Sequence, residues 1–224
     1  FARPSVLVDL NPIPELSYVS RSSGGLRIGA MTRQSTIERS ELVALGWPLL
    51  LEAVSQVAHP AIRNRGTVGG SVAQADPKAE LPVALTALDA RFHVRSARGS
   101  RTLSAGELFV GPMFTALAPG ELLCEIELPA PPAGARMAFI EYSRTHGDFA
   151  LAGAAIVVAQ GGHAAVALLG AGPAPVRAAA CERAVVAGVA AAEAAEFAGG
   201  LVTDDFQRAL VTTLVARALE RVQS

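Results

Sequence analysis

Cysteine is scarce in this sequence. Cys124 and Cys181 lie far apart, in no CxxC motif and with no histidine at ligand spacing. This excludes an iron–sulfur cluster or a structural zinc site built on these thiols, since both need several ligands at defined spacing. A low cysteine content also suits a reducing compartment, and we expect a cytoplasmic protein.

Clustered charge and long apolar runs are also missing. The net charge is −1, the isoelectric point is near 6.5, and the basic residues are scattered. Nucleic-acid-binding surfaces need clustered Lys and Arg, so neither nucleic acid nor an anionic membrane is an expected partner. Hydrophobic residues make up 51% of the chain, but no uninterrupted apolar run approaches the length of a membrane span.

No set of catalytic residues emerges from spacing. Ser71 has no histidine near it in the sequence, and Glu125 and Glu127 alternate along a predicted strand, which favours a solvated sheet face over a catalytic pair. The four histidines share no spacing and are expected to be surface or packing residues: His59, His93, His146 and His163. A chain without reactive groups of its own is consistent with chemistry supplied by a cofactor.

The most unusual stretch present is residues 63–77, RNRGTVGGSVAQADP. Three glycines fall within five residues, and Thr67 and Ser71 flank them. Such a stretch favours close approach of a ligand to the main chain, where free N–H groups and hydroxyls bind phosphate, and Asp76 could accept hydrogen bonds from sugar hydroxyls. The glycines fit neither the Walker pattern nor GxGxxG, so a tight turn between two strands remains the alternative.

Apolar periodicity predicts an α+β fold in two domains, residues 1–130 and 135–224, separated by the PAPPAG segment. In the first domain we expect a strand at 5–10, hairpins at 18–29 and 91–103, a strand at 122–128, and helices at 33–39, capped by Thr32, at 48–57 and at 77–88. In the second we expect strands at 137–144, 152–160 and 164–169, then helices at 178–186, 190–198 and 204–222. The last helix is expected to present one apolar face: Phe206, Leu210, Leu214 and Ala218.

Six sequence blocks, in order, resemble the flavoprotein (medium) subunit, or FAD domain, of molybdenum hydroxylases such as carbon monoxide dehydrogenase and xanthine dehydrogenase. They are RPSVLVDLNPIPEL, GLRIGAMT, HPAIRNRGTVGGSVAQADPKAELP, ELLCEIELP, FIEYSRTHGDFALAGAA and PVRA, starting at Arg3, Gly25, His59, Glu121, Phe139 and Pro175. The resemblance implies the second subdomain of a PCMH-type FAD-binding domain, followed by a C-terminal domain with a three-stranded antiparallel sheet and helices.

The resemblance also implies ten FAD-binding positions. The main chain of the 67–71 stretch would follow the pyrophosphate, two acidic residues would face ribityl or ribose hydroxyls, and three apolar residues would border the cofactor. In that order they are Thr67, Val68, Gly69, Gly70 and Ser71; Asp76 and Glu80; and Ala58, Leu123 and Ile140. For Leu123 and Ile140, core packing is the alternative.

The same resemblance implies the surrounding complex. The FAD would receive electrons from 2Fe-2S clusters on a small subunit, after a large subunit with the molybdenum cofactor oxidises the substrate, and would pass them to an external acceptor. The expected assembly is a dimer of heterotrimers. The family's usual N-terminal subdomain, with a first FAD loop, has no counterpart in this sequence. The alternative function is therefore a non-catalytic assembly or docking module that does not hold FAD tightly.

Overall fold

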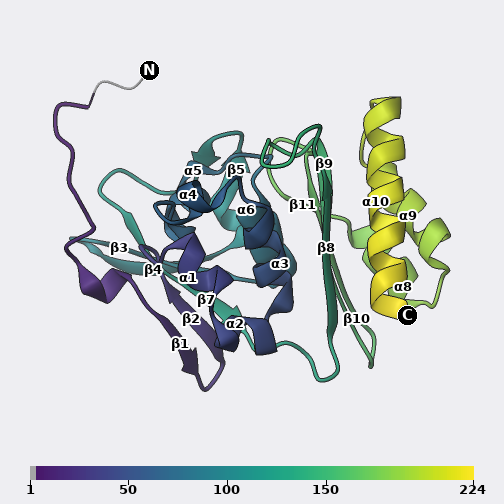
Figure 1. Ribbon diagram of the computed structural model, residues 1–224, viewed down its shortest axis with the longest axis horizontal. Helices are drawn as coiled ribbons and strands as arrows, with labels where there is room; N and C mark the ends of the chain where they lie inside the picture. Colours follow the sequence, from purple (N-terminus) through teal and green to yellow (C-terminus); the bar gives the residue numbers. More distant parts are fainter. Residues whose placement is uncertain (1–3) are drawn as a thin grey trace.

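The computed structural model describes residues 4–224. Its elements form alternating layers: a first sheet, a layer of short helices, a second sheet, and a final layer of helices (Figure 1). The PAPPAG segment connects the first sheet to the second. None of the helices within residues 4–224 combines the length and the apolar character needed to cross a bilayer.

The first sheet has five antiparallel strands. Their order is β1 (Val19–Ser22), β2 (Gly25–Gly29), β7 (Leu122–Pro129), β3 (Arg91–Ser96) and β4 (Gly99–Ser104). Alternation along each strand gives two different faces. One face is apolar and buried against the helices, with Leu26, Ile28, Phe92, Ile126 and Leu128 in the core. The other face is polar.

The helical layer consists of short helices between the sheets. They are α1 (Gln34–Glu38), α2 (Glu41–Gly46), α3 (Pro48–Gln56), α4 (Pro60–Arg63), α5 (Val68–Gln74), α6 (Glu80–Ala87) and α7 (Ala105–Leu108); a 3-10 helix (Pro14–Leu16) and the hairpin β5 (Phe109–Gly111) and β6 (Phe114–Thr115) lie beside them. Pro48 and Pro60 each open a helix, where a missing N–H costs nothing. Arg63 is buried, and its guanidinium donates to both carboxylate oxygens of Glu38, which fastens α4 to α1.

The second sheet is buried on both faces. Its order is β11 (Val176–Arg177), β10 (His163–Leu169), β9 (Ala152–Ala159) and β8 (Arg136–Tyr142). Phe139, Ala155 and Val157 belong to the same core as the first sheet, whereas Ala154 and Ile156 pack against the final helices. Those helices are α8 (Ala179–Val186), α9 (Ala191–Gly199) and α10 (Asp205–Gln223). One core therefore extends across the proposed domain boundary.

The structure confirms the predicted hairpins at 18–29 and 91–103 and all six predicted helices, and it corrects four details. Residues 5–10 form no strand, and Val6, Leu7 and Val8 are exposed. Thr32 does not cap α1, because its hydroxyl is hydrogen-bonded to the backbone of Tyr18. The second sheet has a fourth strand, β11. The apolar face of α10 excludes Phe206, which is 65% exposed.

Candidate functional site

The glycine-rich stretch forms the start of helix α5. Thr67 is the N-cap residue, and its Oγ1 accepts a hydrogen bond from the Gly70 N–H at 3.0 Å. Gly66, Gly69 and Gly70 do not have the positive φ angles that only glycine tolerates easily. Gly69 is required for space instead, because a Cβ there would lie 2.5 Å from the Cβ of Ala30. The stretch is therefore a tightly packed helix start and not the turn between strands considered above.

The main-chain donors of this helix start are already used within the protein. The N–H of Val68 donates to the Thr32 carbonyl at 3.0 Å, and the N–H of Gly69 donates to the Ala30 carbonyl at 2.8 Å. The N–H of Gly70 is satisfied by the Thr67 cap. The row of free N–H groups expected at 68–70 is therefore not present, because neighbouring backbone accepts from them.

Two hydroxyl groups remain as uncharged donors. Thr67 Oγ1 accepts from the Gly70 N–H, and Ser71 Oγ accepts from Gln34 Nε2 at 2.9 Å. A hydroxyl that accepts a hydrogen bond still has its own proton to donate. Thr67 and Ser71 can therefore both donate to an anion while keeping their contacts within the protein.

These groups open onto a cleft of about 550 Å³ between the helical layer and the segment that follows β8. The volume is in the range of small-molecule sites, roughly 300–1,000 Å³. The cleft is lined by Gln34, Val57, Ala58, Ile62, Arg65, Gly66, Thr67, Gly70, Ser71, Gln74, Glu80, Gly147, Asp148 and Phe149. It thus combines apolar walls with hydroxyls, a guanidinium and carboxyl groups.

Five of the ten residues predicted from the sequence to bind FAD line this cleft. They are Ala58, Thr67, Gly70, Ser71 and Glu80. Val68 and Gly69 are buried beneath it. Asp76 accepts a hydrogen bond from the N–H of Lys78 at 2.9 Å. Leu123 lies in the core of the first sheet, and Ile140 packs against the final helices. The FAD-binding roles of all ten stay a prediction.

Sequence reasoning missed several residues that line the cleft. Arg65 offers a cation for a phosphate, and the 147–149 segment supplies Phe149, which is 66% exposed. Both residues lie inside the sequence blocks that carry the family resemblance. Arg65 directly precedes Gly66, so its position beside the glycines could have identified it as a candidate. Ala58 has a φ of 41°, a left-handed conformation that is uncommon outside glycine and that is often found at functional sites.

Two carboxyl groups near this region, one buried and one half-buried, have raised pKa values. Glu80 is 7% exposed, and burial, with a contribution from the Asp76 carboxylate, raises its pKa to about 7. Burial also raises the pKa of Glu141 to about 8, and the charge of Glu80 adds to this rise. Glu141 Oε2 is buried without a hydrogen-bond partner among the described residues. At neutral pH the pair therefore holds at least part of its protons.

Glu141 lies next to Ile140 on β8, and successive side chains of a strand point to opposite faces. Phe139 belongs to the core shared with the first sheet, while Ile140 packs with the helix-side core. By this alternation Glu141 shares the face of Phe139, toward the helical layer that carries Glu80. Of the two neighbours, Glu141 is therefore the one directed toward the cleft side.

The fold is thus a two-sheet α+β arrangement with a cleft at the start of α5 that combines apolar walls with hydroxyl, guanidinium and carboxyl groups. Residues 1–131 match the family described as the FAD binding domain in molybdopterin dehydrogenase. Because this match spans more than half of the 224 residues, the chain belongs to that family.

Relatives with known roles support this assignment. The chain is 46% identical over 157 residues to the 6-hydroxypseudooxynicotine dehydrogenase complex subunit alpha of Paenarthrobacter nicotinovorans, covering 70% of this chain and 53% of that protein. It is 36% identical over 181 residues to the carbon monoxide dehydrogenase medium chain of Hydrogenophaga pseudoflava, covering 79% and 63%. The alignments thus span between about half and two thirds of these relatives.

Solved structures agree in fold. Carbon monoxide dehydrogenase from Hydrogenophaga pseudoflava superposes with a TM-score of 0.92 at 33% identity, over 99% of this chain and 83% of that one. Quinoline 2-oxidoreductase from Pseudomonas putida 86 superposes with a TM-score of 0.90 at 34% identity, over 98% and 82%. These likenesses confirm the predicted α+β medium-subunit fold.

Proposed function

We propose that this chain is the FAD-carrying electron-transfer component of a molybdenum hydroxylase and that FAD binds in the cleft above α5. FAD supplies the chemistry of this step, because it accepts electrons and passes them on. The single observation that carries the proposal is the cleft, in which the predicted residues of the glycine stretch, two hydroxyl donors and Arg65 come together.

The residues that line the cleft fit such a cofactor. Its phosphates would be bound by side-chain donors and not by the main-chain N–H groups that the sequence suggested. Thr67 and Ser71 offer hydroxyl protons, Arg65 offers a charge-assisted contact to phosphate, and Gly70 leaves the wall open beside the cap. Glu80, with its pKa of about 7, can donate to or accept from a sugar hydroxyl near neutral pH. The cleft thus contributes binding and orientation.

The proposed setting follows from the relatives. Proteins named as the medium chain or the alpha subunit of dehydrogenases act within larger complexes. We therefore propose a molybdenum-binding large subunit and a small subunit with 2Fe-2S clusters as partners, in a cytoplasmic dimer of heterotrimers. Electrons would pass from those clusters to the FAD and then to an external acceptor.

The test is replacement of Gly70, which is exposed in the cleft. A Cβ at this position would lie 2.7 Å from Thr67 Oγ1, so Gly70→Leu displaces the cap and fills part of the cleft. Losing even one charge-assisted hydrogen bond of about 1.5–3 kcal/mol weakens binding by about tenfold or more. We expect the purified variant to lose its flavin absorbance on dialysis while it still unfolds cooperatively, with a loss of stability of about 0.5–2 kcal/mol, the usual cost of a helix cap.

The matched control is Gly46→Leu, since a Cβ at Gly46 would meet nothing within 4 Å and Gly46 lies outside the cleft lining. This variant should keep its flavin. Unchanged flavin affinity in Gly70→Leu would refute the assignment of the cleft. A wild-type protein that takes up no FAD at all would favour the assembly module instead.

A further inference from the structure

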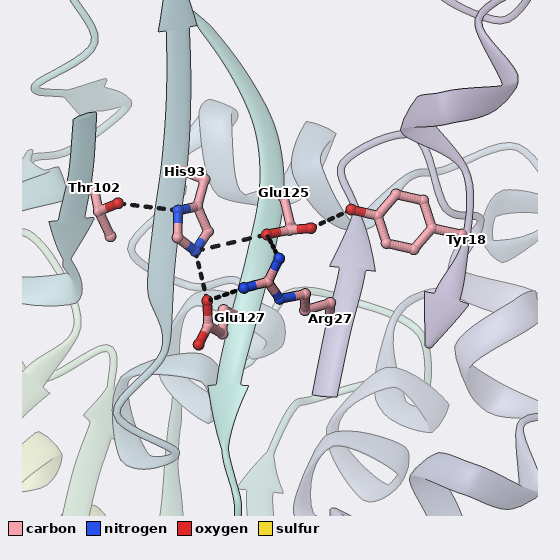
Figure 2. Close-up of polar contacts among 6 residues, drawn as sticks. All are labelled: Tyr18, Arg27, His93, Thr102, Glu125 and Glu127. Atoms are coloured by element: carbon pink, nitrogen blue, oxygen red, sulfur yellow. Dashed lines mark hydrogen bonds and ion pairs between the residues drawn. The ribbon is translucent and has the colours of Figure 1, made fainter. Parts of the chain in front are cut away.

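A polar cluster lies on the outer face of the first sheet, apart from the cleft. It consists of Tyr18, Arg27, His93, Thr102, Glu125 and Glu127 (Figure 2). His93 lies on β3, directly opposite Glu125 of the central strand β7, and Glu127 is two residues further along β7. Rigid, paired strands therefore hold an imidazole and two carboxylates that the sequence separates by more than 30 residues.

The three groups point their ligand atoms at one another. His93 Nε2 lies 2.8 Å from Glu127 Oε2 and 3.7 Å from Glu125 Oε1, and all three atoms fall within 4.8 Å of one another. A zinc ion about 2.0–2.2 Å from each nitrogen or oxygen ligand needs ligand atoms roughly 3–3.5 Å apart. The observed spacing meets this requirement with small side-chain adjustments.

The surrounding groups orient these ligands. Thr102 Oγ1 lies 2.9 Å from His93 Nδ1, and a hydroxyl can donate to this nitrogen or accept from it. Without a cation, Nε2 donates to Glu127 Oε2. With a cation bound in place of that proton, Thr102 can accept from Nδ1–H and so favour the tautomer whose Nε2 lone pair faces the metal, as second-shell partners of metal-bound histidines do. Tyr18 donates its hydroxyl to Glu125 Oε2, which leaves Oε1 of that carboxylate directed toward His93.

The guanidinium of Arg27 would compete with a metal ion for the carboxylates of Glu125 and Glu127. This guanidinium lies 3.6 Å from Glu125 Oε1 and 3.4 Å from Glu127 Oε2, longer than a close charge-assisted hydrogen bond, and the Arg27 side chain is 45% exposed. A long, exposed side chain gains little from such contacts and can move into solvent. The two carboxylates would then be free to bind a cation.

We propose that His93, Glu125 and Glu127 form a divalent metal site with a preference for Zn²⁺, completed by water. One imidazole and two carboxylates suit Zn²⁺, whereas Mg²⁺ prefers oxygen ligands alone. The site would cross-link β3 to β7 on a face that does not contribute to the flavin cleft. It is independent of the proposed function.

The experiment is calorimetric titration of ZnCl2 into purified protein stripped with a chelator, with MgCl2 as a second probe. We expect one Zn²⁺ per chain, an increase in the unfolding temperature with Zn²⁺, and no comparable response to Mg²⁺. His93→Gln and Glu127→Gln should each weaken zinc binding by about tenfold or more. Arg27→Gln should instead bind zinc more tightly, because the competing cation is gone.

The control is His146→Gln, since the rings of His146 and His59 lie close together, with centroids 6.3 Å apart, and offer zinc a second pair of imidazoles. It should bind zinc as the wild type does. The proposal is overturned if the wild type binds no zinc, if His146→Gln loses zinc binding while His93→Gln retains it, or if Arg27→Gln binds more weakly. Fluorescence of Trp47, the only tryptophan in the chain, checks that each variant is folded.

Discussion

Replacement of Glu141 by glutamine should make the protein more resistant to alkaline pH. Burial raises the pKa of Glu141 from its ordinary 4.5 to about 8, so between these values the folded state holds a proton that the unfolded state has released. Stability then falls as pH rises through this window, by about 1.4 kcal/mol for each pH unit. The upper bound is about 5 kcal/mol, and partial solvation of the site should reduce it to about 2–3 kcal/mol.

Glutamine has the shape of the protonated acid and never ionises. At about pH 5, Glu141→Gln and the wild type should therefore have nearly equal free energies of unfolding, and at about pH 9 the variant should be more stable by the amount above. For a chain of this size the difference corresponds to roughly 5–10 °C in melting temperature. Urea unfolding followed by Trp47 fluorescence measures it, since Trp47 is buried.

The exposed Glu196 on α9 supplies the control, because Glu196→Gln should leave the pH dependence of stability unchanged. Glu80→Gln should shift the alkaline loss in the same direction as Glu141→Gln, since Glu80 also has a raised pKa. A variant Glu141→Gln that is destabilised equally at both pH values would refute this reasoning. The buried Oε2 would then have a partner that glutamine cannot replace.

Two further predictions concern packing around the cleft. Arg63→Ala should destabilise the protein by about 3 kcal/mol in urea unfolding, because it leaves the Glu38 carboxylate, whose pKa Arg63 lowers, without its partner. Arg101→Ala removes an equally close but more exposed ion pair, and it should lower the free energy of unfolding much less. Similar losses of stability in the two variants would contradict the role of burial. Gly69→Ala should lower the free energy of unfolding by about 1–3 kcal/mol, because the new Cβ has no space beside Ala30. Gly46→Ala, where the Cβ meets nothing, should be neutral or slightly stabilising. Equal effects of the two variants would contradict the packing at Gly69.

Strands and helices with a clear period could be predicted from the sequence. The hairpin β9–β10 and helix α3 lie where alternation and Pro48 placed them. Residues 5–10 have the composition of a strand but no neighbouring strand to pair with, and a strand needs a partner that local sequence does not reveal. β11 has only two residues, too few to show a period.

The site was predictable in its location more than in its chemistry. Three glycines beside hydroxyl residues pointed to the cleft wall, and the structure places Thr67, Gly70 and Ser71 there. The N–H groups of Val68 and Gly69 donate to Thr32 and Ala30, more than 30 residues earlier in the chain, so the loss of free N–H groups could not be read locally. The pairing of Glu80 with Glu141 depends on the second sheet packing against α6, which is likewise a long-range contact.

The second sheet is buried on both faces and joins the two sequence halves through one shared core. If the chain were cut within the 129–134 segment, the first half would expose the apolar underside of its helices and the second would expose one whole face of its sheet. Each fragment would then present a large apolar surface and would tend to aggregate. Extra residues inserted at 131–134, beyond the backbone contacts of Pro129 and Ala130 with the first sheet, should be tolerated, because they lengthen a connection without separating the faces. For protein engineering, this segment is a place to insert sequence and not a place to divide the chain.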